Sequence, residues 1–278
     1  MIALLFAVTA CSPTAMLSGI SPSGHFAVAS GIPYGELEHQ TLDIYTPLDY
    51  AGPLPLVVYF YGGGWIKGKK EEFEFVASSL TEAGYVVVIA DYRRFPDVVF
   101  PAFIEDGAAA VAWAVEHADD YGADPGKLFL VGHSAGAHIA AMLSMDASYL
   151  ANHDIDTKQI KGFVGLSGPY DFLPLTEGYL LDVFPEATRE QSQPVAYVTT
   201  DAPDTLLIHG VDDDIVYAAN SESLAATLAE HGVDVTLKLY EGAGHGAIVV
   251  ALAPPLDFVE QTLDDTRAFL DARSFPSR

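Results

Sequence analysis

The 278-residue sequence is poor in basic residues and contains one cysteine, and each shortage excludes a class of protein. It has 13 Lys and Arg against 38 Asp and Glu, which gives a formal net charge of −25 at pH 7. That charge excludes nucleic-acid binding, because contact with a polyanion requires clustered positive charge. The one cysteine, Cys11, excludes a disulfide framework within the chain. The N-terminal apolar run, residues 2–10, is too short to span a bilayer as a helix.

The apolar content, in contrast, is ample for a folded domain. Half of the residues are hydrophobic and 18% are charged, which supports a sizeable core and argues against disorder. The length suits one large α/β domain.

Apolar runs alternate with helical patterns along the chain. Near-continuous apolar runs, typical of strands buried on both faces of a parallel sheet, occupy residues 56–61, 85–90, 127–132, 162–166 and 205–209. Alternating patterns predict further strands over residues 233–240 and 41–46, and the second stops at Pro47 as an edge strand would. Helical spacing of apolar residues covers 103–118, 221–231 and 256–272. This order predicts an α/β fold: a mostly parallel, doubly wound sheet with helices on both faces, which binds ligands at the carboxyl ends of its strands.

The N-terminal residues 1–31 are predicted to lie outside this domain, which then covers residues 32–278. Residues 8–14, VTACSPT, resemble the lipobox of a bacterial lipoprotein signal peptide, whose cysteine carries the lipid. The resemblance implies export, lipidation of Cys11 and membrane attachment. A signal peptide also has a basic start, whereas the first basic residue is Lys67, so an accidental match and a cytoplasmic protein are the alternative. Residues 12–31, rich in small residues, are interpreted as a tether.

Residues 132–136 read GHSAG, a G-x-S-x-G pattern centred on Ser134. A strand-like run precedes it and a helix-forming run, residues 137–143, follows, as a nucleophile elbow requires. Glycines flank the serine because a Cβ at either position would collide with the neighbouring strand or helix. The pattern predicts that Ser134 is a nucleophile at the carboxyl edge of the sheet.

A serine hydroxyl needs a base within hydrogen-bond reach, and the base needs an acid to orient it. His245 lies in the glycine-rich segment 242–246 directly after a predicted strand, where small neighbours leave its ring room to reach the serine. Among the other histidines, we interpret His209 as a loop-structuring residue and His138 as a core or helix histidine. His133 is assigned no proton transfer.

Three consecutive aspartates, residues 212–214, follow the predicted strand at 205–209 and can supply the acid. A cation site is disfavoured here, because adjacent carboxylates on a turn point apart and no further oxygen-ligand spacing is present. Asp171, which follows the preceding strand, is the reserve acid.

The segment YGGGW, residues 61–65, follows a predicted strand and is interpreted as an oxyanion hole. Backbone N–H groups can be aimed at a developing oxyanion only where side chains do not intrude. The N–H of Ala135 adds a further donor. The long irregular connection at 167–203 is predicted to form a small cap over the site. The predicted substrate pocket is lined by Trp65, Ile66, Phe172 and Ile215.

Together, YGGGW at 61–65, DYR at 91–93, GHSAG, HGxxDxxV at 209–216 and GxGH at 242–245 resemble the esterase and lipase branch of the α/β-hydrolase superfamily. The nearest group is the small carboxylesterases related to hormone-sensitive-lipase-like esterases and kynurenine formamidases. The resemblance covers residue 34 to the C-terminus and implies an α/β-hydrolase fold without cofactor or metal. It selects Asp213 as the acid, and Gly63 and Gly64 as oxyanion donors. Tyr61 departs from the family's usual His, so a different contact must hold the glycine loop.

We therefore expect a serine carboxylic ester hydrolase that cleaves short-chain, small-molecule esters through an acyl-enzyme with a Ser-His-Asp triad. The alternatives are an aryl formamidase of the kynurenine formamidase type, an acetyl or feruloyl esterase acting on acylated sugars, and a non-catalytic binding protein on the same fold. The residues leave acyl-chain length, alcohol preference and oligomeric state open.

Overall fold

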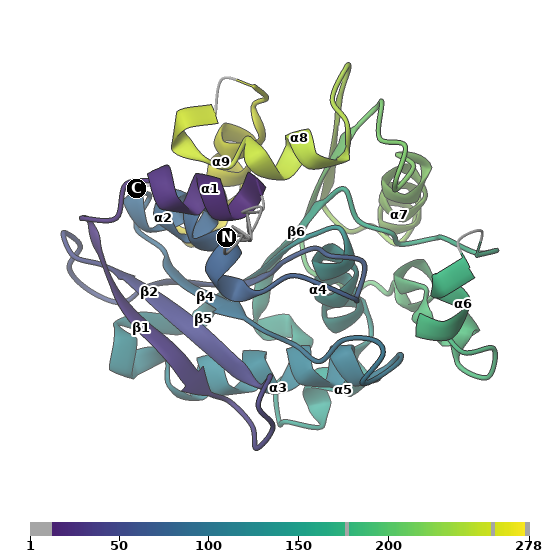
Figure 1. Ribbon diagram of the computed structural model, residues 1–278, viewed down its shortest axis with the longest axis horizontal. Coiled ribbons are helices and arrows are strands. Elements are labelled where there is room, and N and C mark those ends of the chain that lie inside the picture. Colours follow the sequence, from purple (N-terminus) through teal and green to yellow (C-terminus); the bar gives the residue numbers. More distant parts are fainter. Residues whose placement is uncertain (1–12, 176–177, 257–258, 276–278) are drawn as a thin grey trace, which may run out of the picture.

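In the computed structural model, which describes residues 13–175, 178–256 and 259–275, one sheet runs through the whole molecule (Figure 1). Within these ranges its eight strands follow the order β1-β2-β4-β3-β5-β6-β7-β8. They are β1 (Phe26–Pro33), β2 (Thr41–Pro47), β3 (Leu54–Phe60), β4 (Val86–Ala90), β5 (Ala123–His133), β6 (Ile160–Leu166), β7 (Thr205–Gly210) and β8 (Val235–Tyr240). The β1–β2 and β2–β4 pairs are antiparallel and the other pairs are parallel. The predicted mostly parallel α/β fold is confirmed.

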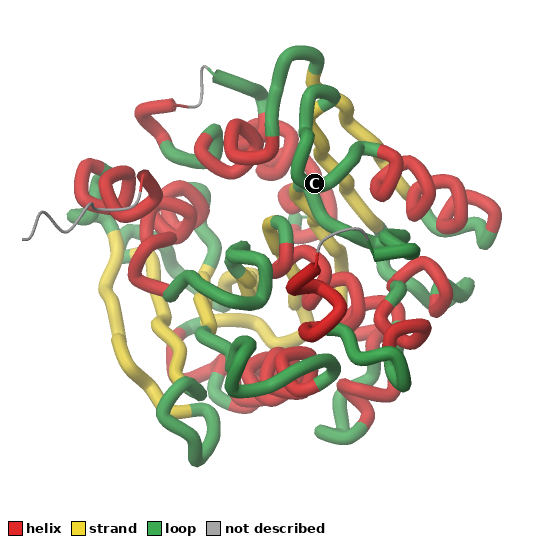
Figure 2. The backbone as a smooth tube through the Cα atoms, turned by 45° about the vertical axis from the view of Figure 1, so that its right-hand side comes forward, coloured by secondary structure: helices red, strands yellow, loops and turns green. Residues whose placement is uncertain are grey.

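Helices cover both faces of the sheet (Figure 2). They are α1 (Pro13–Ile20), α2 (Glu74–Glu82), α3 (Ala102–Glu116), α4 (Ala135–Met145), α5 (Ala147–Ala151), α6 (Gly178–Val183), α7 (Ala219–Glu230), α8 (His245–Val250) and α9 (Thr262–Ser274). Short 3₁₀ helices are η1 (Lys70–Phe73), η2 (Ala118–Tyr121), η3 (Thr157–Gln159), η4 (Arg189–Ser192), η5 (Pro194–Tyr197) and η6 (Pro254–Leu256). The β3-α2-β4 and β4-α3-β5 crossovers run in opposite directions along the sheet, so right-handedness places α2 and α3 on opposite faces.

The central strands are apolar because both of their faces are covered. Every residue of β3 and of β4 is buried. In a sheet open on one side, half of these positions would face water and the sequence would alternate. The continuous runs therefore predicted these strands from the sequence, and the strand ends agree within two residues.

The N-terminal part of the described chain belongs to the fold, so the prediction of a tether was wrong for residues 13–31. In α1, Leu17 is buried and the hydroxyl of Ser18 donates a 3.0 Å hydrogen bond to the carbonyl of Glu72. Strand β1 pairs with β2, and the N–H of Gly31 donates to Oδ1 of Asp43 at 2.7 Å. Strand β2 is consequently not an edge strand. The small residues suggested flexibility, whereas buried apolar side chains and strand pairing hold the segment in place.

Cys11 lies outside the described residues, and its lipidation stays a prediction. Among the residues that are described, no helix combines the length and the apolar character needed to cross a bilayer.

The connection between β6 and β7, predicted to be a cap, contains α6, η4 and η5. Its Phe184 is fully buried and meets the rings of Trp65 and His138 edge to face, with centroids 4.8 Å and 5.7 Å away. The N–H of Phe100 also donates to the carbonyl of Val183 at 2.9 Å. These contacts hold this connection against the loops at the carboxyl ends of β3 and β4.

Candidate active site

Ser134 occupies the sharp turn between β5 and α4. Its φ of 55° lies in the region that non-glycine residues rarely adopt. The strained turn is held from outside, since the N–H of Ser134 donates to the carbonyl of Leu166 at 2.9 Å. A side chain at Gly132 would collide with the backbone of Gly136, and one at Gly136 with that of Phe60. The local sequence therefore permits close packing of strand and helix around this serine.

The structure brings Ser134, His245 and Asp213 together in one hydrogen-bonded series. Nε2 of His245 lies 2.9 Å from Oγ of Ser134, and Nδ1 lies 2.8 Å from Oδ2 of Asp213. An ionised carboxylate only accepts hydrogen bonds, so the ring proton resides on Nδ1. Nε2 is then free to accept the hydroxyl proton. These residues come from turns after β5, β8 and β7, which end at the same edge of the sheet.

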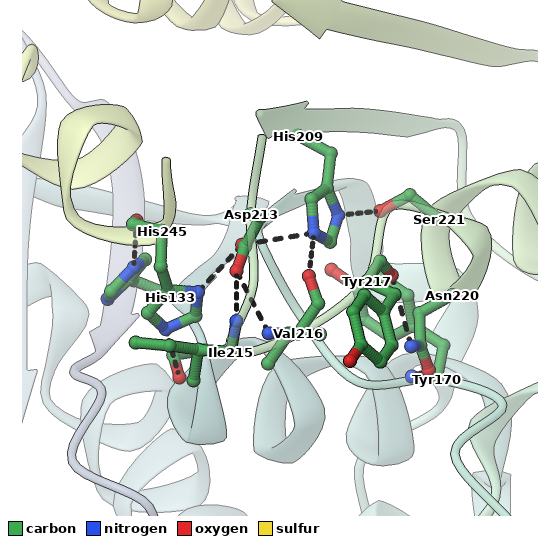
Figure 3. A network of polar contacts seen from close by, with 11 residues as sticks. His133, Tyr170, His209, Asp213, Ile215, Val216, Tyr217, Asn220, Ser221 and His245 are labelled. Carbon is green, nitrogen blue, oxygen red and sulfur yellow. Dashed lines mark hydrogen bonds and ion pairs between the residues drawn. The ribbon is translucent and has the colours of Figure 1, made fainter. Parts of the chain in front are cut away.

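The carboxylate of Asp213 is buried and fully occupied by donors, as Figure 3 shows. Oδ1 accepts the N–H groups of Ile215 and Val216 at 3.0 Å and 2.9 Å. Oδ2 accepts from His245, and Nε2 of His209 also lies 3.2 Å from it. Burial alone would raise the pKa of Asp213, but the hydrogen bonds from His209, His245 and Val216 outweigh it and hold this pKa well below its ordinary value. Asp213 is thus a permanent anion at neutral pH.

The other aspartates considered as the acid lie elsewhere. Asp212 and Asp214 are exposed beside Asp213. Asp171 is also exposed, and its Oδ2 accepts the hydroxyl of Ser223 at 2.6 Å. Within the described residues, none of the three forms a hydrogen bond or ion pair with His245.

Two further histidines lie close to the series and are held neutral. Burial, and to a smaller extent the neighbouring His245, lowers the pKa of His133 to about 3. Its Nε2 lies 3.3 Å from the carbonyl of His245 and donates to it. Burial lowers the pKa of His138 to about 4, and its Nε2 donates to the carbonyl of Ser192 at 2.7 Å. His138 thereby joins the elbow helix α4 to the connection between β6 and β7.

The glycine loop lies directly against the elbow. A Cβ on Gly62 would come within 2.9 Å of the Cβ of Ser134. Gly63 and Gly64 have φ angles of 144° and 62°, which favour glycine. In the described part of the chain, their N–H groups donate to no hydrogen-bond acceptor. Ala135 is the first residue of α4, where the N–H lacks an intrahelical acceptor.

Sequence reasoning missed two neighbours of this site. The first is His209, which does structure the loop through the Val216 carbonyl but also lies beside Asp213, and its spacing of four residues from Asp213 was the available signal. The second is Tyr179 of α6, whose hydroxyl would lie 3.0 Å from a Cβ on Gly64. No local pattern indicates this contact, because it joins the glycine loop to α6, more than 100 residues further along the chain.

The side chains predicted to line a pocket do not share one environment. Trp65 is only 4% exposed and packs among the rings of Phe103, His138, Phe172 and Phe184. Phe172 is half-buried in the same cluster. Ile66 and Ile215 are 42% and 69% exposed. Trp65 is therefore a core residue, whereas the two isoleucines lie on the surface beside the glycine loop and the acid.

No group of three or more His, Cys, Asp or Glu side chains suited to a metal ion occurs within the described ranges.

Comparisons with known proteins agree with the fold. The family model described as BD-FAE matches residues 42–228. An isoprenylcysteine alpha-carbonyl methylesterase of Arabidopsis thaliana is 30% identical over 78% of this chain and 56% of its own length. Esterase LipQ of Mycobacterium tuberculosis is 27% identical over 91% of this chain and 65% of its own length. The chain thus spans less than two thirds of these relatives.

Solved structures share the architecture. A truncated carbohydrate esterase from gut microbiota superposes with a TM-score of 0.79 at 22% identity, covering 91% of this chain and 99% of that one. Esterase 2 of Thermogutta terrifontis gives a TM-score of 0.76 at 24% identity, covering 92% and 98%. At such identities the likeness concerns the fold.

Proposed function

Because the chain belongs to the BD-FAE family and has the α/β-hydrolase fold, we propose that it is a serine carboxylic ester hydrolase acting on small-molecule esters. The observation that carries the proposal is the series from Ser134 through His245 to Asp213, with spacings of 2.9 Å and 2.8 Å. The relatives named as esterases support the same reaction class.

In the proposed reaction, Oγ of Ser134 attacks the ester carbonyl while Nε2 of His245 takes the hydroxyl proton. The tetrahedral intermediate then collapses, the bond to the alcohol oxygen breaks, and His245 gives the proton to the leaving alcohol. Water attacks the resulting acyl-enzyme through the same proton transfers and releases the acid. No cofactor takes part in this sequence.

Asp213 keeps the proton of His245 on Nδ1 and stabilises the imidazolium that forms in each step. The N–H groups of Gly63, Gly64 and Ala135 bind the oxyanion. Loss of one such donor costs on the order of 10²–10³ in rate, because the donors are fixed before charge develops.

We assign short acyl chains to the site on the support of one close approach beside the glycine loop. The hydroxyl of Tyr179 faces Gly64 so closely that even a methyl group there would touch it at 3.0 Å. The exposed side chains of Ile66 and Ile215 offer apolar contact at the rim. A series of p-nitrophenyl esters from acetate to octanoate tests this assignment, and kcat/KM should fall as the acyl chain lengthens.

Variants of the three residues test the mechanism. Ser134→Ala should reduce hydrolysis of p-nitrophenyl acetate to the background rate and abolish labelling by a fluorophosphonate, while Ser148→Ala, at an exposed serine, should do neither. Asp213→Asn should lower kcat at least about 10³-fold, since the amide imposes the wrong tautomer on His245. Asp171→Asn, its matched control, should be active. Turnover by Ser134→Ala at the wild-type rate would overturn the proposal.

The same residues could open a formamide. Comparing kcat/KM on N-formylkynurenine with that on p-nitrophenyl acetate separates an aryl formamidase from an ester hydrolase, and we expect the ester to be preferred.

A further inference from the structure

The catalytic series proposed above has a fourth member, His209, on the far side of the carboxylate. His209 is the fifth residue of β7 and has no exposed surface. In Figure 3 its ring lies between Asp213 and Ser221, with His245 on the opposite side of Asp213. Nε2 lies 3.2 Å from Oδ2 of Asp213 and 2.7 Å from the carbonyl of Val216. Nδ1 lies 2.7 Å from Oγ of Ser221.

These contacts determine where the ring proton resides. A backbone carbonyl accepts hydrogen bonds and cannot donate, so the short contact to Val216 requires a proton on Nε2. That N–H donates to the Val216 carbonyl, and Oδ2 of Asp213 lies 3.2 Å from the same nitrogen. In the neutral ring Nδ1 is an acceptor, and the hydroxyl of Ser221 is placed to donate to it. The Val216 carbonyl therefore selects the tautomer, and the hydroxyl of Ser221 supports it by donating to Nδ1.

The carboxylate meets four N–H groups in this arrangement. Two backbone groups, from Ile215 and Val216, bind Oδ1, and two imidazole groups, from His245 and His209, approach Oδ2. Rotation of the carboxyl group would break contacts on both oxygens at once. Because the group is buried, each broken contact would leave a charged acceptor without a partner.

We propose that His209 is a positioning residue for the reaction: held by Ser221 and the Val216 carbonyl, it fixes the Asp213 carboxylate so that Oδ2 faces Nδ1 of His245. This inference rests on the proposed function and adds a residue to it. His209 touches no substrate atom, because it is fully buried behind the acid. A role limited to shaping the loop would need only the Val216 contact.

The test measures kcat, KM and the pH profile for His209→Met, His209→Gln and Ser221→Ala on p-nitrophenyl acetate. Fluorophosphonate titration supplies the number of competent sites, so that kcat is expressed per site. His209→Met should lower kcat per site about 10- to 100-fold at unchanged KM, the range expected for one hydrogen bond to a charged group. His209→Gln, which retains an N–H donor at the Nε2 position, should recover most of this loss, and Ser221→Ala should fall between wild type and His209→Met.

The acid limb of the rate profile gives a second readout. With one hydrogen-bond donor fewer, the Asp213 carboxylate attracts the His245 imidazolium more strongly. The acid limb of the pH–rate profile should therefore move to higher pH in His209→Met. A purely structural role would reduce the titrated sites and leave both kcat per site and the limb unchanged, and that result overturns the proposal. Should His209→Met fail to fold, Ser221→Ala alone decides, because wild-type kcat and an unmoved limb contradict the inference.

Failure of this inference is distinguishable from failure of the proposed function. If the wild-type protein is labelled at Ser134 and hydrolyses the ester, while the His209 and Ser221 variants equal it per site, only the role of His209 is wrong. If Ser134→Ala keeps wild-type turnover, the proposed function fails and the role of His209 with it.

Discussion

The phenol of Tyr61 donates a 2.6 Å hydrogen bond to Oδ1 of Asp91, the first residue after β4. The same oxygen accepts the N–H of Lys70 at 2.9 Å, so one carboxylate holds both ends of the loop that contains the three glycines. The Tyr61 ring is stacked between Phe73 and Tyr92, with centroid distances of 5.2 Å and 4.9 Å. Burial, followed by the nearby Tyr92 and Asp91, raises the pKa of Tyr61 well above its ordinary value, so the phenol keeps its proton. This contact is the one that holds the glycine loop in place of the His expected from the resemblance.

Removing that hydroxyl should loosen the glycine loop. We expect Tyr61→Phe to lower kcat on p-nitrophenyl acetate several-fold with little change in KM, because the donors would be less well fixed when the oxyanion forms. The free energy of unfolding should fall by about 1.5–3 kcal/mol, as for a lost hydrogen bond to a charged group. Steady-state kinetics and urea unfolding check both effects. Tyr50→Phe, at an exposed tyrosine distant from the loop, is the control. Unchanged kinetics in Tyr61→Phe would contradict this role.

A methyl group at Gly62 should disturb the site more directly. It would lie 2.8 Å from Nδ1 of His133 and 2.9 Å from the Cβ of Ser134, closer than real Cβ contacts. The loop must then move away from the serine, and a displacement of about 1 Å costs on the order of 10² in rate. We expect Gly62→Ala to lower kcat by at least about tenfold. Gly24→Ala, where a Cβ meets nothing within 4 Å, should leave kcat unchanged. Equal activity of the two variants would show that the loop tolerates the shift.

Acidification should destabilise the fold through the two buried neutral histidines. Burial lowers the pKa of His138 to about 4 and of His133 to about 3, whereas an unfolded histidine titrates near 6.5. Between these values the unfolded chain binds more protons than the folded protein, so the free energy of unfolding falls as pH falls. Between pH 6.5 and pH 4, each of the two histidines should lower the free energy of unfolding by roughly 2–3 kcal/mol. The contribution of Asp213 is lost only at lower pH, because its pKa is also lowered and an unfolded aspartate titrates near 4.

Urea unfolding at pH 7, 6, 5 and 4 measures this loss. His138→Gln keeps an N–H donor for the carbonyl of Ser192 but cannot be protonated. Its unfolding free energy should therefore fall less steeply with acidification than that of the wild-type protein. Parallel curves for the two proteins would exclude His138 as a source of acid sensitivity.

Local patterns were enough to predict most of the sheet. Strands β3 and β4 could be predicted from the sequence because burial on both faces leaves an uninterrupted apolar run. The turn at Ser134 could be predicted from the G-x-S-x-G pattern, because the backbone approaches so closely at Gly132 and Gly136 that neither position accepts a side chain. Residues 13–31 were wrongly predicted, since small residues suit both a tether and an edge strand, and only pairing with β2 distinguishes them.

The sequence by itself determined the fold class, the elbow and the order of serine, acid and base, because each depends on neighbours within a few residues. The family resemblance at residues 209–216 selected Asp213 from the three aspartates, and the tertiary structure gives the physical reason, since only Asp213 is buried and meets His245. Only the tertiary structure decided that His209 shares that carboxylate and that Trp65 belongs to the core. These outcomes depend on loops from β3, β5, β7 and β8 meeting at one edge. Contacts between segments so far apart in the chain follow from packing and strand register, which no local pattern encodes.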